Sequence, residues 1–261
     1  PSAHRKRGNP PPRPFSPMHV DGSMRRTPPQ DDRPHRELHG RHKSRPLRPA
    51  QQRVMDALLP RLRVDPPADG TLDPRATFDA GIREVWLEIG FGAGEHLAWQ
   101  AAQHPDVGVI GAEHFRDGIA RLLRQVESGQ LTRNVRVYPG DGRDLLDVLP
   151  DACLTRVFVL FPDPWPKRKH HKRRFVQQAQ LDQLARVLAD GGELRLATDD
   201  PSYQRWMLVE LARHWAFDWT AERPDDWRRR GPDWPATRYE QKAIEAGRQP
   251  IYLTYRRRAR G

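Results

Sequence analysis

The sequence predicts a doubly wound α/β domain, that is, a mostly parallel β-sheet with helices on both faces. From Ile82 onward, short runs of β-branched and apolar residues alternate with longer segments of helical periodicity, which is the pattern of successive βα units. A glycine-rich turn follows the first apolar run, and acidic residues stand at or near the ends of the first three. In such sheets ligands bind beyond the carboxyl ends of the strands, so we expect the functional residues there.

The first half of the predicted domain consists of three strands that alternate with three helices. The apolar runs predict strands over residues 85–89, 107–113 and 135–138. The helical segments that follow them cover residues 95–103, 116–128 and 143–149. Each strand is thus followed by a helix, which is the crossover that parallel pairing requires.

The second half contains two more strands, residues 155–161 and 193–198, and two helices, residues 175–189 and 201–215. The first of these helices carries its apolar residues on one face and is expected to end in a glycine C-cap at Asp190-Gly191-Gly192. An aromatic and proline-rich stretch follows. The last strand, residues 251–255, is expected to pair antiparallel with the sheet.

The N-terminal region differs in composition from the predicted domain. Residues 1–50 carry 11 of the 26 prolines and 12 Lys and Arg against 4 Asp and Glu, with few large apolar residues. This composition predicts a disordered basic tail, which is a solvated extension, an auxiliary RNA-binding arm or a segment removed by processing. Residues 51–81, with a short helix near 53–59, are expected to pack as an extension on the domain formed by residues 82–261.

The charge and the cysteine content exclude several classes of protein. Of the net charge of +11, +8 belongs to the tail and +3 to residues 51–261. Such basicity indicates a polyanionic partner, with nucleic acid ahead of a membrane surface. A single cysteine excludes a disulfide framework and a cysteine zinc site, and no apolar run approaches the length of a transmembrane helix. We therefore expect a cytoplasmic protein with no membrane span and no metal.

The turn after the first strand indicates a cofactor that lacks a pyrophosphate. Its glycines, Gly90, Gly92 and Gly94, let the backbone fold tightly and let a ligand approach. A dinucleotide-binding turn would have glycine three positions after Gly92. Glu95 stands there instead, and its bulk and negative charge suit a pyrophosphate badly.

Three acidic residues near the strand ends extend this interpretation. Glu113 can accept hydrogen bonds from the two hydroxyls of a ribose, and Asp141 can accept one from an adenine amino group. Together with Glu88 they favour a nucleoside that bears a positive charge, of which S-adenosylmethionine is the commonest. Taken singly, the glycines also fit an ordinary turn and the acids fit helix N-caps.

The segment after the fourth strand predicts the substrate side of the site. In Phe161-Pro162-Asp163-Pro164-Trp165-Pro166, prolines restrict the backbone on both sides of Asp163. Residues 167–174 follow with six formal positive charges, without which residues 51–261 would go from +3 to −3. A charge run is often only a solvated face, but its place beside the expected crevice favours contacts with RNA phosphates. Trp165 either covers a substrate base or packs in the core.

On these motifs the sequence resembles the bacterial single-subunit tRNA (guanine-N7-)-methyltransferases, which belong to the class I S-adenosylmethionine-dependent methyltransferases with a Rossmann-like fold. The order and spacing match over about 80–256. The motifs are E-I-G-F-G-A-G (88–94), E-H-F-R-D-G (113–118), L-F-P-D-P-W-P-K-R-K-H-H-K-R-R (160–174), L-A-T-D (196–199) and T-R-Y-E (237–240). Gly142 and Tyr239 depart from the residues expected there, Ala and Phe, without removing a functional group.

The resemblance implies methyl transfer from S-adenosylmethionine to N7 of a guanine in tRNA, guanine 46 in the variable loop. It implies that Glu88, Glu113, Asp141 and Asp163 contact the cofactor and that Asp163 is catalytic. The residues that it implies for guanine and tRNA binding are Lys167, Lys169, His170, His171, Lys172, Arg173, Arg174, Asp199, Thr237, Arg238, Tyr239 and Glu240. The family includes monomers and homodimers, so the oligomeric state stays open.

Two of these groups also have structural interpretations. Thr237 and Glu240 form the pattern of a capping box that opens a helix closed by Gly247, and Asp199 before Asp200-Pro201 fits a helix N-cap. Two rival functions remain as well: a non-catalytic RNA-binding protein on this fold, and a methyltransferase that acts on a small molecule.

Overall fold

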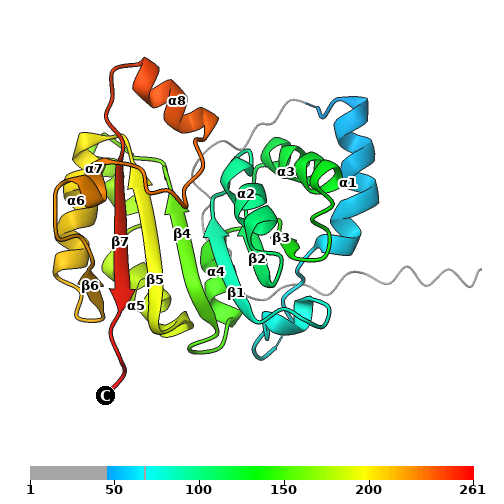
Figure 1. Ribbon diagram of the computed structural model, residues 1–261, viewed down its shortest axis with the longest axis horizontal. Coiled ribbons are helices and arrows are strands. Elements are labelled where there is room, and N and C mark those ends of the chain that lie inside the picture. Colours follow the sequence, from blue (N-terminus) through cyan, green and yellow to red (C-terminus); the bar gives the residue numbers. More distant parts are fainter. Residues whose placement is uncertain (1–45, 68) are drawn as a thin grey trace, which may run out of the picture. The chain divides into compact units, whose positions relative to one another are not determined.

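A seven-stranded sheet with helices on both faces forms the body of the protein in the computed structural model, which describes residues 46–67 and 69–261 (Figure 1). The strands are β1 (Glu84–Ile89), β2 (Val107–Ala112), β3 (Val135–Tyr138), β4 (Leu154–Leu160), β5 (Leu188–Thr198), β6 (Phe217–Trp219) and β7 (Ile251–Arg257). Their order is β3-β2-β1-β4-β5-β7-β6, in which β1 to β5 pair in parallel and β7 pairs antiparallel with both neighbours. The predicted fold class is confirmed.

The α-helices are α1 (Pro49–Leu62), α2 (Glu95–Gln103), α3 (Arg116–Gly129), α4 (Gly142–Val148), α5 (Gln178–Val187), α6 (Pro201–Ala212), α7 (Asp225–Arg228) and α8 (Arg238–Glu245). Two 3₁₀ helices are η1 (Arg75–Thr77) and η2 (Arg168–Arg173). Most predicted elements are present with ends within a few residues of those expected. The short elements η1, η2, β6 and α7 were not predicted, because three to six residues are too few to show a hydrophobic period.

Two hydrophobic cores lie on opposite faces of the sheet. One contains buried residues of α4, α5 and α6, and the other contains those of α1, α2 and α3. Within β1, Val85 and Leu87 belong to the first core while Trp86 belongs to the second, because successive side chains of a strand point to opposite faces. A strand buried on both faces reads as a continuous apolar run, which explains why the parallel strands were visible in the sequence.

The N-terminal segment joins the second core. α1 buries Val54, Met55, Leu58 and Leu62, and the chain after it pairs with β3 through a hydrogen bond from Val64 N to Val137 O (2.8 Å). The helix begins at Pro49, inside the segment expected to be tail, and proline suits the first turn because the N–H there has no partner within the helix. The prediction of disorder concerns mainly residues 1–45, which lie outside the described residues. In the described part, every helix is too short or too polar to cross a membrane.

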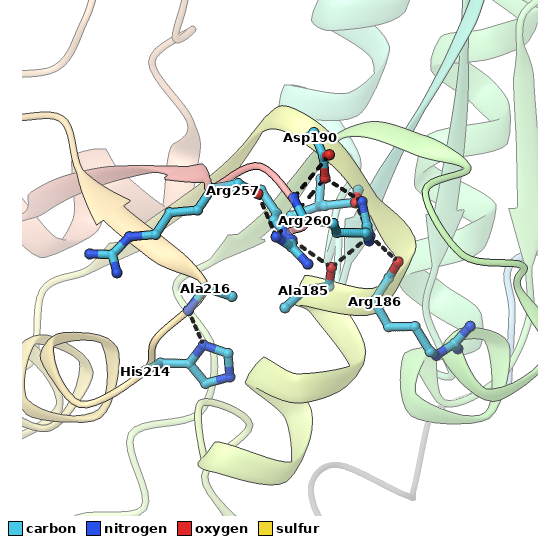
Figure 2. Close-up of polar contacts among 9 residues, drawn as sticks. Ala185, Arg186, Asp190, His214, Ala216, Arg257 and Arg260 are labelled. Carbon is cyan, nitrogen blue, oxygen red and sulfur yellow. Dashed lines mark hydrogen bonds and ion pairs between the residues drawn. The ribbon is translucent and has the colours of Figure 1, made fainter.

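The glycine C-cap predicted for α5 is wrong. The helix ends at Val187, because Leu188 already pairs with Leu154 of β4, and Gly191 (φ 77°) forms the irregular turn before pairing resumes at Glu193. The final carbonyl groups of α5 are capped from the C-terminus of the chain instead (Figure 2). Arg257 Nε donates to Ala185 O (3.0 Å), and Arg260 donates to the carbonyl oxygens of Ala185, Arg186 and Leu188 at 3.1, 2.7 and 2.7 Å.

Arg257 is expected to be important for stability. Its side chain is only 3% exposed, so a substitution removes one of the two donors to the Ala185 carbonyl, together with an ion pair to Asp190. Arg257→Met should lower the free energy of unfolding by about 2 kcal/mol, measured by urea denaturation. Arg256→Met, on an exposed position of the same strand, is the control and should change it by less than about 0.5 kcal/mol. Equal effects of the two substitutions would contradict this role.

Candidate active site

The residues singled out in the sequence gather at one edge of the sheet. Since β1 to β5 are parallel, the segments that follow them leave the sheet at the same edge. α8 lies beyond this edge as well (Figure 1): Arg238 N donates to Glu95 Oε2 (2.7 Å), and the Tyr239 ring lies 5.7 Å from that of Phe161. The start of α8 thus contacts both the first turn of α2 and the segment after β4.

The glycine turn between β1 and α2 has a backbone that requires glycine. Gly90, Gly92 and Gly94 have φ values of 70°, 57° and 75°, in the left-handed region that other residues rarely adopt. α3 approaches this turn so closely that a Cβ atom on Gly118 would lie 2.3 Å from the carbonyl oxygen of Gly92. The turn is therefore fixed by its own backbone and by a helix packed directly against it.

Glu113 holds the turn in place from the end of β2. Its Oε2 accepts a hydrogen bond from Gly92 N (3.0 Å) and its Oε1 accepts one from Phe115 N (2.9 Å), and the residue is 8% exposed. Each carboxylate oxygen has a second lone pair, so these bonds leave Glu113 able to accept from a ligand hydroxyl. One side chain can thus fix the turn and bind a ribose.

Glu88 is buried and bonded to a histidine that sequence reasoning missed. Glu88 Oε2 lies 2.7 Å from His96 Nδ1, and both side chains are 3% exposed. On the far side of the ring, Gln100 Nε2 lies 3.2 Å from His96 Nε2 and donates to Asp233 O (2.8 Å). The Gln100 amide nitrogen can only donate, so His96 Nε2 accepts its hydrogen bond. The proton of the neutral ring is then on Nδ1, which donates a hydrogen bond to Glu88. No sequence pattern indicates this pair, since the glycine turn brings β1 and α2 together.

Asp141 is an N-cap as well as a candidate ligand. Its carboxylate accepts from Arg143 N (2.9 Å) at the start of α4 and also from Arg143 Nε (2.9 Å). The hydrogen bond to Asp141 is the largest cause of a raised pKa of Arg143. The capping interpretation left open by the sequence is confirmed here. Any ligand that reaches Asp141 therefore meets a carboxylate already partly neutralised by a guanidinium.

The segment between β4 and η2 has a strained backbone around an exposed acid. Phe161 and Trp165 have φ values of 49° and 43°, which are uncommon for residues with a side chain. Asp163 lies between them and is exposed. Strained conformations persist only where the surroundings hold them, and they concentrate at functional sites. The stiffness expected from the prolines is thus accompanied by strain on both sides of Asp163.

The basic run after this segment is mostly exposed. Lys167, Lys169 and Lys172 are exposed, while His170, His171 and Arg173 are half-buried. Trp165 is half-buried among them: Arg173 lies over its ring at 5.1 Å, and the His170 ring is 5.8 Å away. Trp165 is thus not a residue of the hydrophobic cores, and its ring packs against residues of the basic run.

Arg174 is in the interior, although the resemblance implied that it contacts tRNA. It is 2% exposed, and it donates from Nε to Pro164 O (2.8 Å) and from a terminal nitrogen to Ser202 Oγ (2.8 Å). Its guanidinium also lies 4.9 Å from the Tyr203 ring and 5.1 Å from the Trp206 ring. Burial lowers the pKa of Arg174. In this position it anchors the backbone next to Asp163 to the first turn of α6.

Asp199 and Asp200 have separate roles. Asp200 is the N-cap of α6, since its carboxylate accepts from Tyr203 N (2.8 Å). The interpretation of Asp199 as this cap is therefore wrong. Asp199 instead accepts a hydrogen bond from Arg248 Nε (2.6 Å), a residue that the sequence did not single out. Any ligand that reaches Asp199 therefore meets a carboxylate already paired with a guanidinium.

The start of α8 forms the predicted capping box. Glu240 N donates to Thr237 Oγ1 (3.2 Å) and Thr237 N donates to Glu240 Oε2 (3.3 Å). Glu240 is 5% exposed and also accepts a hydrogen bond from the hydroxyl of Tyr252. The structural interpretation is thus confirmed for Thr237 and Glu240, whereas Arg238 and Tyr239 face outward, with Tyr239 58% exposed. Nowhere in the described part do three or more His, Cys, Asp or Glu residues gather as a metal site would require.

Comparison with known proteins identifies the family. The profile of a family described as putative methyltransferase matches residues 83–253. The tRNA (guanine-N(7)-)-methyltransferase of Rhodospirillum rubrum is 53% identical over 226 residues, which cover 85% of this chain and 88% of that protein. The chain belongs to the tRNA (guanine-N7-)-methyltransferase family. The predicted family and enzyme class, a methyltransferase, are confirmed.

Further relatives of this methyltransferase agree. The tRNA (guanine-N(7)-)-methyltransferase of Ruegeria pomeroyi is 51% identical over 232 residues, covering 87% of this chain and 96% of the relative. Among solved structures, the 16S rRNA methyltransferase KamB superposes with a TM-score of 0.51 over 71% of this chain and 91% of that chain, at 15% identity. The similarity to KamB supports the class I methyltransferase fold and says nothing about the substrate.

The contact between α3 and the glycine turn predicts the effect of a small substitution. Gly118→Ala places a methyl group against a backbone oxygen that cannot move without shifting the turn, so it should weaken binding of S-adenosylmethionine, the donor expected from the sequence, by about tenfold or more in calorimetry. Gly129→Ala is the matched control in the same helix, where the new Cβ would meet only the Leu131 side chain at 3.2 Å. Unchanged affinity in a folded Gly118→Ala protein would contradict the proposed geometry.

Proposed function

We propose that this methyltransferase transfers a methyl group from S-adenosylmethionine to N7 of a guanine in tRNA, guanine 46 of the variable loop. The observation that carries the proposal is the position of Asp163. It is exposed on a strained segment, next to an exposed basic run, at the sheet edge that also carries the glycine turn. The names of the relatives, at about half identity over most of their length, support the same reaction.

The residues present suit the proposed methyl donor. A close-packed glycine turn and the acids Glu88, Glu113 and Asp141 lie at the ends of three neighbouring strands. Carboxylates favour a ligand with a positive charge, and a turn without phosphate-binding features suits a nucleoside without phosphates. When bound, S-adenosylmethionine supplies an electrophilic methyl group on a sulfonium. Glu113 would bind its ribose, Asp141 its adenine, and Glu88 and Asp163 its charged portion.

The basic run supports RNA as the acceptor. Lys167, Lys169, His170, His171, Lys172 and Arg173 are all at least partly exposed around η2. Lysine and arginine side chains bind nucleic acid chiefly through its phosphates, with an affinity that falls steeply as salt rises. A small-molecule acceptor would give no reason for such a surface beside the site.

The proposed reaction needs positioning more than proton transfer. Guanine N7 carries an in-plane lone pair and is a nucleophile when neutral, so no base must deprotonate it. Alignment of the nucleophile with the reacting carbon can contribute about 7 kcal/mol or more in favourable cases. The product base gains positive charge, and the carboxylates of Asp163 and Asp199 would stabilise that charge as it develops. Asp199 would also accept from guanine N1–H and the exocyclic amine, which adenine does not present in the same pattern.

The test of this function is transfer of labelled methyl from S-adenosylmethionine to unmodified tRNA, followed by chemical cleavage at 7-methylguanine. Label at a single guanine is expected. Label at another base would contradict the proposal, and binding without transfer would indicate a non-catalytic RNA-binding protein. Binding should weaken with a log–log salt slope of about −4 to −5 if five or so phosphates are contacted.

Asp163→Asn should reduce methyl transfer below about a tenth of the wild-type rate, because it removes the charge and keeps the shape. Since Asp163 is exposed, the melting temperature and the affinity for tRNA should change little. Glu127→Gln, an exposed acid in α3, is the control and should leave the rate unchanged. A rate above a tenth in the Asp163→Asn protein would show that the carboxylate is not catalytic.

A further inference from the structure

A second surface leads away from the candidate active site along α6. Two hollows adjoin this helix, with volumes of about 460 and 480 Å³. Both are lined by Leu208 and Ala212, so they adjoin. The first begins at Pro201, and the second ends against β6 and β7. We call this surface the α6–β6 groove.

The groove exposes unusually large apolar side chains. Of the five large hydrophobic residues that are exposed in the described part of the chain, three belong to it: Val209 (40% exposed), Trp215 (65%) and Trp219 (44%). Single exposed hydrophobic residues need no explanation, but a cluster of them marks a binding surface. Two tryptophans on one hollow indicate a partner with flat rings.

Both indole rings have close neighbours that restrict their orientation. Trp215 lies nearly parallel to the His214 ring (17°, centroids 6.1 Å apart), and Arg257 lies over it at 5.4 Å. Figure 2 shows Arg257 beside the end of α5, where its hydrogen bond to Ala185 fixes it. Trp219 is likewise nearly parallel to Tyr255 (17°, 6.3 Å). These neighbours restrict the rings before any ligand arrives, which lowers the entropy cost of stacking on them.

The charge of the groove favours an anionic partner. Its lining carries Arg205, Arg213 and Arg258 and a single acid, Asp218, which is paired with Arg258 at 2.7 Å. A second copy of this chain that used the same surface would place like charges together. The N-terminal segment of this chain is itself strongly basic and would be repelled. Nucleic acid combines flat bases with phosphates and matches both features.

The groove is continuous with the candidate site. α6 starts directly after Asp199 and Asp200, and its first turn contacts Arg174 through Ser202. Its 12 residues extend for about 18 Å. A nucleic acid bound at the basic run can therefore continue along α6 to the tryptophans without leaving the protein surface.

We propose that the α6–β6 groove is a second RNA-binding surface, on which unpaired bases of the substrate stack on Trp215 and Trp219 while Arg205 and Arg213 supply positive charge to the backbone. This inference rests on the proposed function for the identity of the natural RNA. The groove is proposed to bind RNA and not to take part in the methyl transfer itself.

The test compares two double variants. The alanine protein carries Trp215→Ala and Trp219→Ala, and the phenylalanine protein carries Trp215→Phe and Trp219→Phe, which keep an aromatic ring at both positions. The alanine protein should bind tRNA about tenfold or more weakly and raise the KM for tRNA equally, with kcat and the affinity for S-adenosylmethionine within about twofold of wild type. The phenylalanine protein should bind nearly as well as wild type. Circular dichroism checks that both proteins fold. Equal tRNA affinity in the wild-type and alanine proteins would overturn the proposal.

Three further measurements separate this inference from its alternatives. A short unpaired oligoribonucleotide should quench tryptophan fluorescence in the wild-type protein, and should quench it much less in the alanine protein. This result would support the groove even if the wild-type enzyme failed to methylate tRNA, in which case only the proposed function would be contradicted. Sedimentation showing a wild-type dimer that the alanine protein cannot form would assign the surface to a second copy and overturn the proposal. A soluble quencher that reaches Trp215 and Trp219 only after deletion of residues 1–45 would assign the surface to the N-terminal segment and would also overturn the proposal.

Discussion

The contact between α3 and the glycine turn constrains the whole ligand edge of this protein. The Gly92 carbonyl lies where any side chain at position 118 would have to be, and Glu113 bonds the Gly92 N–H from the end of β2. The turn, the second strand and the helix after it therefore form one rigid unit. Because the turn is fixed in this way, α2 leaves it in one direction only, and His96 on that helix reaches back to Glu88.

Most of the acids at this edge have structural partners as well as proposed ligands. Glu113 bonds two backbone N–H groups, Asp141 caps α4, and Glu240 closes a capping box and accepts from Tyr252. A carboxylate held by such bonds loses little entropy when a ligand arrives, so the structural and binding roles reinforce each other. Asp163 differs, since it is exposed and its position is determined by the backbone around it.

The basic motif is divided by burial into two kinds of residue. Lysines on the 3₁₀ helix point to solvent, where they can meet phosphates, while Arg174 closes the motif in the interior and anchors Pro164 to α6. A buried guanidinium is stable only when its donors are satisfied and its flat faces are covered, and here Ser202, Tyr203 and Trp206 meet these needs. The proposed RNA-binding surface and the geometry of the segment that carries Asp163 thus depend on adjacent residues of one short stretch.

The sequence by itself determined the fold class, the glycine turn, the strand-end acids and the family. These depend on local pattern: apolar runs predict buried strands, glycine predicts left-handed backbone, and an uninterrupted motif such as residues 160–174 needs no three-dimensional information. Only the tertiary structure decided that Arg174 is buried, that Arg257 and Arg260 cap α5, that His96 bonds Glu88, and that Arg248 pairs with Asp199. Those contacts join residues distant in the chain or separated by a sharp turn, and burial and pairing depend on what packs against a side chain, which its sequence neighbours do not specify.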